Sequence, residues 1–233
     1  GFIFTKKIVY VMKQFALLIG RCKTAVQVLI CYAVLSFASS LYAAESLDIS
    51  GYVMHIQMTP AVCALDSARQ KQRKCLEGYS LTIASLLPEL PNNRSCGTNS
   101  SAQLSPLQAK VVARVMPDEN ARRQLWQSVG GCVPMNASQY FRTVINFAGR
   151  LKVPADLTSA NNIEVQQEGL RQQFIKLNPS LPSKGLRFSC QTSKFDTVLT
   201  EISVCYKTNG QYKQCSSHFV SSCPSEFSIK GSY

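Results

Sequence analysis

Histidine and cysteine are the residues that limit the chemistry of this chain. Its 233 residues include two histidines, His55 and His218, with ten cysteines and 13 scattered carboxylates. A metal site built from three histidines is therefore impossible, and any acid–base mechanism with two imidazoles must use this pair. His55 lies in an apolar, strand-like run, where a lone histidine is more often structural than catalytic. We expect His218 to be a surface or structural residue, and nothing in the spacing indicates that the two meet.

Motifs of the common enzyme classes do not occur in the sequence. There is no GxSxG, no phosphate-binding GxxxxGKS/T, no HExxH and no GxGxxG. No CxxC pair or Cys/His cluster with metal-ligand spacing is present either. We therefore expect no bound metal and no cofactor.

The first 44 residues have the pattern of a secretory leader. A basic stretch, 13–23, precedes the apolar run 25–35 (AVQVLICYAVL), and small residues follow as far as Ala44. The alternative is a membrane anchor, because the apolar run and its Ser/Ala tail together approach the roughly 18 residues that a spanning helix needs. The small residues, followed by acidic ones, favour cleavage. We expect upstream residues and a signal peptide over 1–44, one domain over 45–233, and a periplasmic or secreted protein with no membrane contact after cleavage.

Loss of the leader would change both the charge and the cysteine count. The whole chain carries a formal charge of +12, but five of its 25 basic residues and none of its 13 acidic ones precede residue 45. Residues 45–233 therefore hold 20 basic and 13 acidic residues, a formal charge of +7, and eight of the ten cysteines. An even number of cysteines in an exported chain predicts disulfides, although the count alone does not pair them. Zinc is the rival explanation, which the cysteine spacing disfavours.

The hydrophobic pattern predicts strands and helices that alternate along the chain. The strand-like runs are 52–58, 81–87, 186–190, 198–206 and 211–215, with a turn at 209–210. The helical runs are 105–116, 119–126, 139–151 (capped by Ser138) and 165–177. The sequence also predicts a turn at 59–60 and shows no clear period after Cys215. This pattern is typical of an α+β fold with a mostly antiparallel sheet.

Several segments, in the same order, are similar to the ribonuclease T2 family of exported, disulfide-bonded endoribonucleases. They are 52–63 (YVMHIQMTPAVC), 81–89 (LTIASLLPE), 124–132 (QLWQSVGGC), 186–190 and 199–205 (LTEISVC). The resemblance implies a central, mostly antiparallel sheet flanked by helices and held by disulfides. It also implies the disulfide pairs Cys63–Cys75, Cys96–Cys132, Cys190–Cys223 and Cys205–Cys215.

The two catalytic motifs of that family match at their scaffold residues only. Segment 81–89 stands where the family has His-Gly-Leu-Trp-Pro, and segment 124–132 where it has His-Glu-Trp-x-Lys-His-Gly-Thr-Cys. Leu86, Pro88 and Trp126 are kept. The positions of the family's ionisable residues hold Ala84, Gln124, Leu125, Ser128 and Val129. Cleavage through the 2′-hydroxyl needs a base, an acid and positive charge near the phosphate, and none of these side chains supplies them.

We therefore expect a non-catalytic ribonuclease T2-like protein that binds a protein partner or RNA, with the protein partner favoured. RNA would contact the basic segment 69–74, through Arg69, Lys71, Arg73 and Lys74, together with Arg94, Arg122 and Arg123. Such a segment usually forms a solvated face. The alternative is an active endoribonuclease with a rearranged site in which His55 has taken a catalytic role. The sequence leaves the oligomeric state open.

Overall fold

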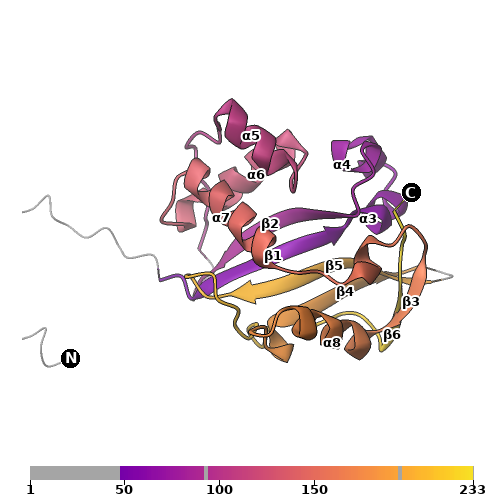
Figure 1. Cartoon of the computed structure of the whole chain (residues 1–233). Coiled ribbons are helices and arrows are strands. Elements are labelled where there is room, and N and C mark those ends of the chain that lie inside the picture. The colour runs from indigo at the N-terminus through magenta and orange to yellow at the C-terminus, as the bar shows by residue number, and fades with distance from the viewer. Residues whose placement is uncertain (1–47, 92–93, 194–195, 233) are drawn as a thin grey trace, which may run out of the picture. The chain divides into compact units, whose positions relative to one another are not determined.

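The computed structural model describes residues 48–91, 94–193 and 196–232. A six-stranded sheet forms the centre of this fold (Figure 1). The strands are β1 (Gly51–Met58), β2 (Leu81–Glu89), β3 (Ile163–Gln166), β4 (Leu186–Thr192), β5 (Thr197–Tyr206) and β6 (Glu226–Ile229). Their order is β2-β1-β5-β6-β3, with β4 paired to β5. All pairs are antiparallel except one bridge between β5 and β6, so the expected α+β fold with a mostly antiparallel sheet is confirmed.

The predicted leader, 1–44, lies outside the described residues. Within the part that is described, no helix has the length and apolar content needed to cross a membrane.

Strand β1 divides its side chains between the two faces of the sheet. Tyr52, Met54, Ile56 and Met58 belong to the main hydrophobic core, where each is at most 3% exposed. Because successive side chains of a strand point to opposite faces, the residues between them, including His55, point away from this core. The polar side chain of His55 therefore lies on the second face of β1.

Six helices accompany the strands in the described ranges, beside several short 3₁₀ turns. They are α3 (Thr59–Leu65), α4 (Arg73–Leu76), α5 (Pro106–Ala113), α6 (Glu119–Val129), α7 (Ala137–Arg150) and α8 (Gln167–Leu177). Helix α7 buries Tyr140, Val144 and Phe147, a spacing that places the three side chains on one face of the helix. Both α6 and α7 pack against β2.

Helix starts differ from the sequence prediction at three places. The expected turn at 59–60 is instead the first turn of α3, where a proline is tolerated because its missing N–H has no partner there anyway. Helix α7 is capped by Asn136, in a capping box with Gln139, and not by Ser138. The predicted helix 165–177 begins only at Gln167, because the preceding residues pair with β6.

Three further differences concern the strands. The tail after Cys215, which shows no period, contributes β6, and the expected strand 211–215 is reduced to a single bridge between Tyr206 and Tyr212. Strand β2 also continues through Pro88, which pairs with Tyr52. A proline is compatible with this position because β2 is at the edge of the sheet.

Four disulfides connect the elements, and they are the four pairs that the resemblance implied. They are Cys63–Cys75, Cys96–Cys132, Cys190–Cys223 and Cys205–Cys215. All cysteines between residues 48 and 232 are used in this way, so none of them is a thiolate that could act as a nucleophile.

Candidate functional site

Ala84 lies at an irregularity in β2. His55 of β1 pairs with Ser85, whereas the next residue, Ile56, pairs with Ile83. Ala84 is therefore the extra residue of a bulge, a feature that re-aims a side chain and is common near functional sites. The side chain there is a methyl group, which neither donates nor accepts a proton.

Helix α6 carries the other four positions that the resemblance aligns with catalytic residues. The two apolar residues lie on its buried side and the two polar ones on its exposed side. Leu125 and Val129 lie one helical turn apart, are 8% and 3% exposed, and belong to the main core. Gln124 and Ser128 lie on the exposed side of the helix. The Ser128 hydroxyl donates to the carbonyl of Leu125 at 2.7 Å, a hydrogen bond within its own helix.

The matching scaffold residues have structural roles. The Trp126 and Tyr140 rings are in contact, with centroids 5.8 Å apart, and the Tyr140 hydroxyl donates to the carbonyl of Leu86 in β2 at 2.8 Å. Burial raises the pKa of Tyr140, so this hydroxyl stays a neutral donor. A Cβ on Gly130 would lie 2.9 Å from the Trp126 ring, closer than the packing allows. These contacts hold α6 and α7 against β2.

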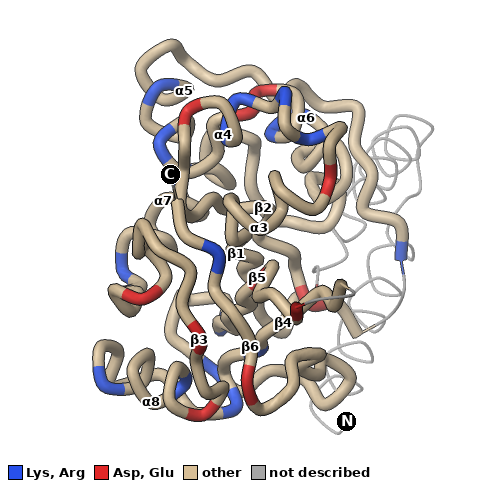
Figure 2. The backbone as a smooth tube through the Cα atoms, turned by 90° about the vertical axis from the view of Figure 1, so that its right-hand side faces the viewer, with Lys and Arg blue, Asp and Glu red and all other residues tan. Residues whose placement is uncertain are grey.

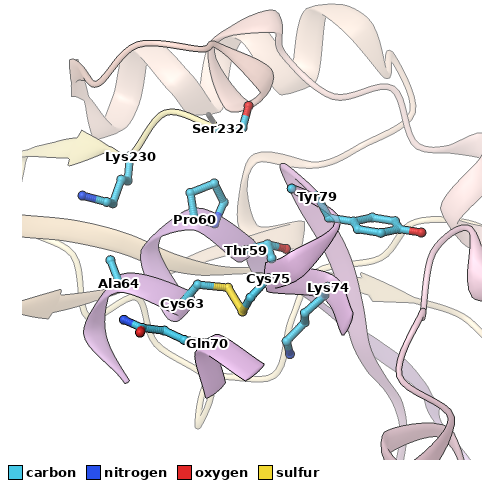
Figure 3. A pocket seen from close by; sticks show the side chains of 11 residues that line it. Thr59, Pro60, Cys63, Ala64, Gln70, Lys74, Cys75, Tyr79, Lys230 and Ser232 are labelled. Atoms are coloured by element: carbon cyan, nitrogen blue, oxygen red, sulfur yellow. A yellow bond between two sulfur atoms is a disulfide. The ribbon is translucent and has the colours of Figure 1, made fainter. Parts of the chain in front are cut away.

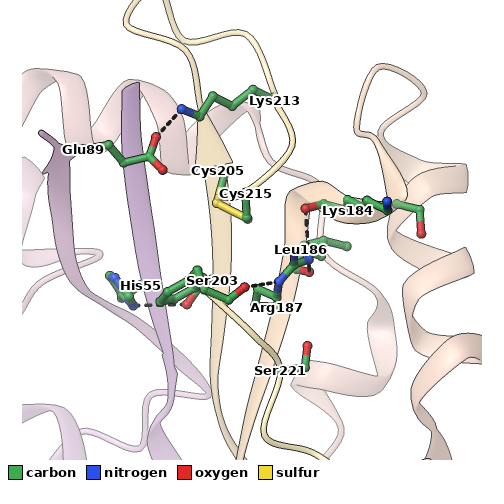
Figure 4. Close-up of a disulfide and its surroundings, with 12 residues drawn as sticks. His55, Glu89, Lys184, Leu186, Arg187, Ser203, Cys205, Lys213, Cys215 and Ser221 are labelled. Atoms are coloured by element: carbon green, nitrogen blue, oxygen red, sulfur yellow. Dashed lines mark hydrogen bonds and ion pairs between the residues drawn. A yellow bond between two sulfur atoms is a disulfide. The ribbon is translucent and has the colours of Figure 1, made fainter. Parts of the chain in front are cut away.

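The second face of the sheet brings together three polar side chains from β1 and β5, of which His55 and Ser203 are labelled in Figure 4. His55 Nδ1 lies 2.7 Å from Glu201 Oε1, and Ser203 Oγ lies 3.1 Å from the same nitrogen and 3.3 Å from the same oxygen. The ring of Phe219 packs edge-on against His55, with centroids 5.7 Å apart. The side chains of His55 and Glu201 are 13% and 28% exposed, so the pair is only partly shielded from water.

A carboxylate bound to Nδ1 fixes the orientation of an imidazole and leaves Nε2 for proton transfer. In the described structure Nε2 of His55 has no hydrogen-bond partner. The neighbouring cation, Arg187 of β4, donates to the backbone carbonyls of Phe219, Lys184 and Leu186 and thereby binds the surrounding backbone. The cluster thus resembles an oriented acid–base group. It contains a single imidazole, however, and the Arg187 guanidinium beside it is bound to backbone carbonyls.

A polar pocket of about 620 Å³ lies beside this cluster. Glu201, Asp66, Arg69 and Gln57 are among the residues that line it. Its two carboxylates outnumber its single guanidinium, so the pocket does not favour a phosphate.

Three of the four basic residues of segment 69–74 are bound by neighbouring side chains, two of them by carboxylates. Arg69 forms an ion pair with Asp66 at 2.9 Å, and Arg73 one with Glu77 at 2.5 Å. Lys74 Nζ donates to Gln57 Oε1 at 2.7 Å, and burial lowers the pKa of this lysine. Lys71 is exposed and is the one member of the four without a hydrogen bond or ion pair to a described residue. Figure 2 shows the same mixture of both charges along α4 and α6.

A smaller pocket, of about 290 Å³, lies next to the Cys63–Cys75 disulfide (Figure 3). Lys74 and Lys230 are its charged lining residues. Of the additional basic residues, Arg122 is buried and donates to the carbonyls of Met116 and Pro117, so it is a structural residue.

His218 is exposed and makes no hydrogen bond or ion pair within the described ranges. The sequence reasoning missed Glu201 and Ser203 as partners of His55. Alternation within the predicted strand 198–206 places these two residues on one face, but only the pairing of β5 with β1 brings that face to His55.

The architecture with its four disulfides is that of ribonuclease T2 structures. Ribonuclease MC1 from the seeds of bitter gourd is 15% identical, with a TM-score of 0.60 over 76% of this chain and 98% of that one. Japanese pear S3-RNase is 18% identical, with a TM-score of 0.57 over 78% and 99%. An RNase-related protein from Calystegia sepium is 15% identical, with a TM-score of 0.61 over 78% and 97%. No protein-family model and no curated protein matches the sequence.

At these identities the likeness establishes the fold. The four disulfides together with this fold fit an extracellular or otherwise oxidising compartment.

Proposed function

We propose that this protein is a non-catalytic member of the ribonuclease T2 fold, exported to the periplasm or secreted, which acts by binding. The observation that carries the proposal is the packing of Leu125 and Val129 into the core, beside a β2 bulge that presents the methyl group of Ala84. The resemblance aligns these three positions with ionisable residues of the family's two catalytic motifs.

Two-step cleavage of RNA depends on those groups. A base must take the proton of the 2′-hydroxyl, an acid must protonate the leaving oxygen, and each role typically contributes about 10²–10⁴ in rate. Positive charge must stabilise the phosphate as its negative charge develops. Ala84, Leu125 and Val129 can neither transfer a proton nor supply positive charge. Gln124 and Ser128 carry no charge.

A protein partner fits the surface better than RNA does. Phosphate contacts require cations that are available to release counterions. Arg69 and Arg73 are held by carboxylates and Lys74 by an amide, which leaves Lys71 as the available cation of the segment. RNA remains the second binding partner to be tested.

One observation favours a second candidate function, an endoribonuclease with a rearranged site. The Glu201 carboxylate orients His55, whose cross-strand neighbour Ser85 follows Ala84 directly. In this alternative His55 acts as the single acid–base group, without the second imidazole.

The deciding experiment incubates the protein with labelled RNA, beside the variants His55→Ala and Glu201→Gln. We expect no cleavage by any of the three. Cleavage by the parent that disappears with His55→Ala would overturn the non-catalytic proposal and establish the alternative.

Filter binding of the same RNA at two salt concentrations distinguishes an RNA partner from a protein partner. We expect weak binding at both, as for a protein-binding surface. Tight binding that falls steeply with salt, and that weakens in Lys71→Ala, would instead establish RNA as the partner.

A further inference from the structure

A third pocket lies where α7 ends and the chain turns back after β5. Its volume is about 700 Å³, within the roughly 300–1,000 Å³ range of small-molecule sites. Arg150, Lys152 and Lys207 line it, and each is exposed. We call it the Arg150 pocket.

The charge of the Arg150 pocket is uncompensated. Across the described residues, no aspartate or glutamate lines the pocket, and none forms an ion pair with its three cations. Among the described residues, the Nζ of Lys207 makes one side-chain hydrogen bond, which it donates to the amide oxygen of Gln211 at 3.5 Å. The pocket therefore holds three positive charges within a small volume, which is the electrostatic requirement for an anion.

Arg150 is held in place without losing its donors. Its guanidinium lies over the ring of Phe147, 5.2 Å from the centroid, and against the backbone of Gly210. A Cβ on Gly210 would collide with Arg150 Nη2 and with the Phe147 ring, so a side chain at this position would displace the guanidinium. Nε donates to the carbonyl of Asn146, whereas both Nη groups have no partner in the described structure. A planar fork with free donors is the group best suited to phosphate oxygens.

A buried hydroxyl provides the second, independent observation. Tyr206 lines the pocket, is 1% exposed, and its hydroxyl has no hydrogen-bond partner among the described residues. Its ring contacts those of Phe147 and Tyr212, with centroids 4.6 and 5.2 Å away. Burial raises the pKa of Tyr206, an effect that the nearby Arg150 charge only partly opposes, so the hydroxyl keeps its proton and remains a donor. An unpaired buried donor is costly, so a ligand that reached this hydroxyl and accepted its hydrogen bond would relieve that cost.

We propose that the Arg150 pocket binds a ligand that carries a phosphate group, of about the size of a mononucleotide. The cations neutralise the phosphate, the Arg150 fork and the Tyr206 hydroxyl donate to its oxygens, and the half-buried ring of Tyr212 offers an aromatic surface to the rest of the ligand. The inference goes beyond the proposed function, since it holds whether or not the chain cleaves RNA.

Titration calorimetry at low salt tests the proposal with inorganic phosphate, AMP, adenosine and a short single-stranded oligonucleotide. We expect phosphate and AMP to bind and adenosine not to bind. Tighter binding of the oligonucleotide than of AMP would identify nucleic acid as the source of the phosphate, and the reverse would identify a free phosphate compound; both support the site if Arg150 is required.

The variant Arg150→Gln should weaken AMP binding about 10-fold or more, as expected for loss of a charge-assisted fork. Tyr206→Phe should weaken it by about threefold or more without lowering the melting temperature, because it removes an unpaired polar group. Lys110→Ala, a change of an exposed lysine on α5, is the matched control and should leave binding unchanged. Absence of binding, equal binding of adenosine, or full affinity in Arg150→Gln would overturn the proposal, and none of these outcomes bears on RNA cleavage.

Discussion

His55 Nδ1 and the Glu201 carboxylate are 2.7 Å apart on the sheet face opposite the main core. The contact joins neighbouring strands, β1 and β5, and Ser203 Oγ completes it from the residue directly across from His55. The histidine that the sequence isolates in an apolar run is therefore a paired residue with a defined orientation.

His55→Ala should lower the free energy of unfolding by about 1–2 kcal/mol, because it removes a hydrogen bond to a carboxylate from a partly exposed site. Urea unfolding monitored by circular dichroism measures the change. The side chain of Glu201 keeps Ser203 and water as partners, so a loss as large as that of a core truncation would contradict the partly exposed geometry.

Introduction of the family's histidine at position 129 should damage the fold and not produce a nuclease. Val129 is 3% exposed in the core, so Val129→His must bury a polar and larger ring at a cost of about 2–3 kcal/mol. Gln124→His, on the exposed side of the same helix, is the control and should change stability by less than about 0.5 kcal/mol. Equal stability of the two variants in urea would show that position 129 is not packed as the structure has it.

Substitution of two glycines by alanine should have opposite effects on stability, because one lies in a strained turn and the other within a helix. Gly210 has φ +81° and lies against Arg150, so Gly210→Ala should destabilise by about 1–2 kcal/mol. Gly149 lies within α7, where a Cβ would meet no other atom within 4 Å, and Gly149→Ala should stabilise by about 0.5–1 kcal/mol. Thermal unfolding should move in opposite directions for the two variants; a shift of the same sign in both would refute this assignment.

Alkaline pH should destabilise the protein through its buried phenols. Burial raises the pKa of Tyr140 above its ordinary value of 10.0, so the folded state retains a proton that the unfolded state loses. The stability contributed by this group is fully present below about pH 10 and is lost as the pH rises beyond it. The free energy of unfolding, followed in urea from pH 8 to about 11, should therefore fall.

Tyr140→Phe is the comparison for that measurement. The variant should lose about 1 kcal/mol of its free energy of unfolding at neutral pH, because the hydrogen bond to Leu86 is lost. Above about pH 10 the free energy of unfolding of the variant should fall less steeply than that of the parent. Parallel alkaline curves for the two proteins would mean that Tyr140 does not carry the effect.

The sequence by itself determined the local features of this fold. Apolar runs predict β1, β2 and β5, most of whose residues are buried or half-buried, and the 3.6-residue period predicts α5, α6 and α7. The order of short segments, with the cysteines among them, was enough to indicate the ribonuclease T2 architecture and its four disulfide pairs. The identities of Ala84 and Val129 are likewise facts of the sequence.

Tertiary structure decided which of these residues work together. Strand β6 has no period of its own and exists because its backbone pairs with β3 and β5, and the pairing of β5 with β1 is what gives His55 its carboxylate. The Arg150 pocket joins side chains from α7 and from the turn after β5, residues that are more than fifty positions apart. Such contacts depend on long-range pairing and packing energies, which a local pattern of residue types does not contain.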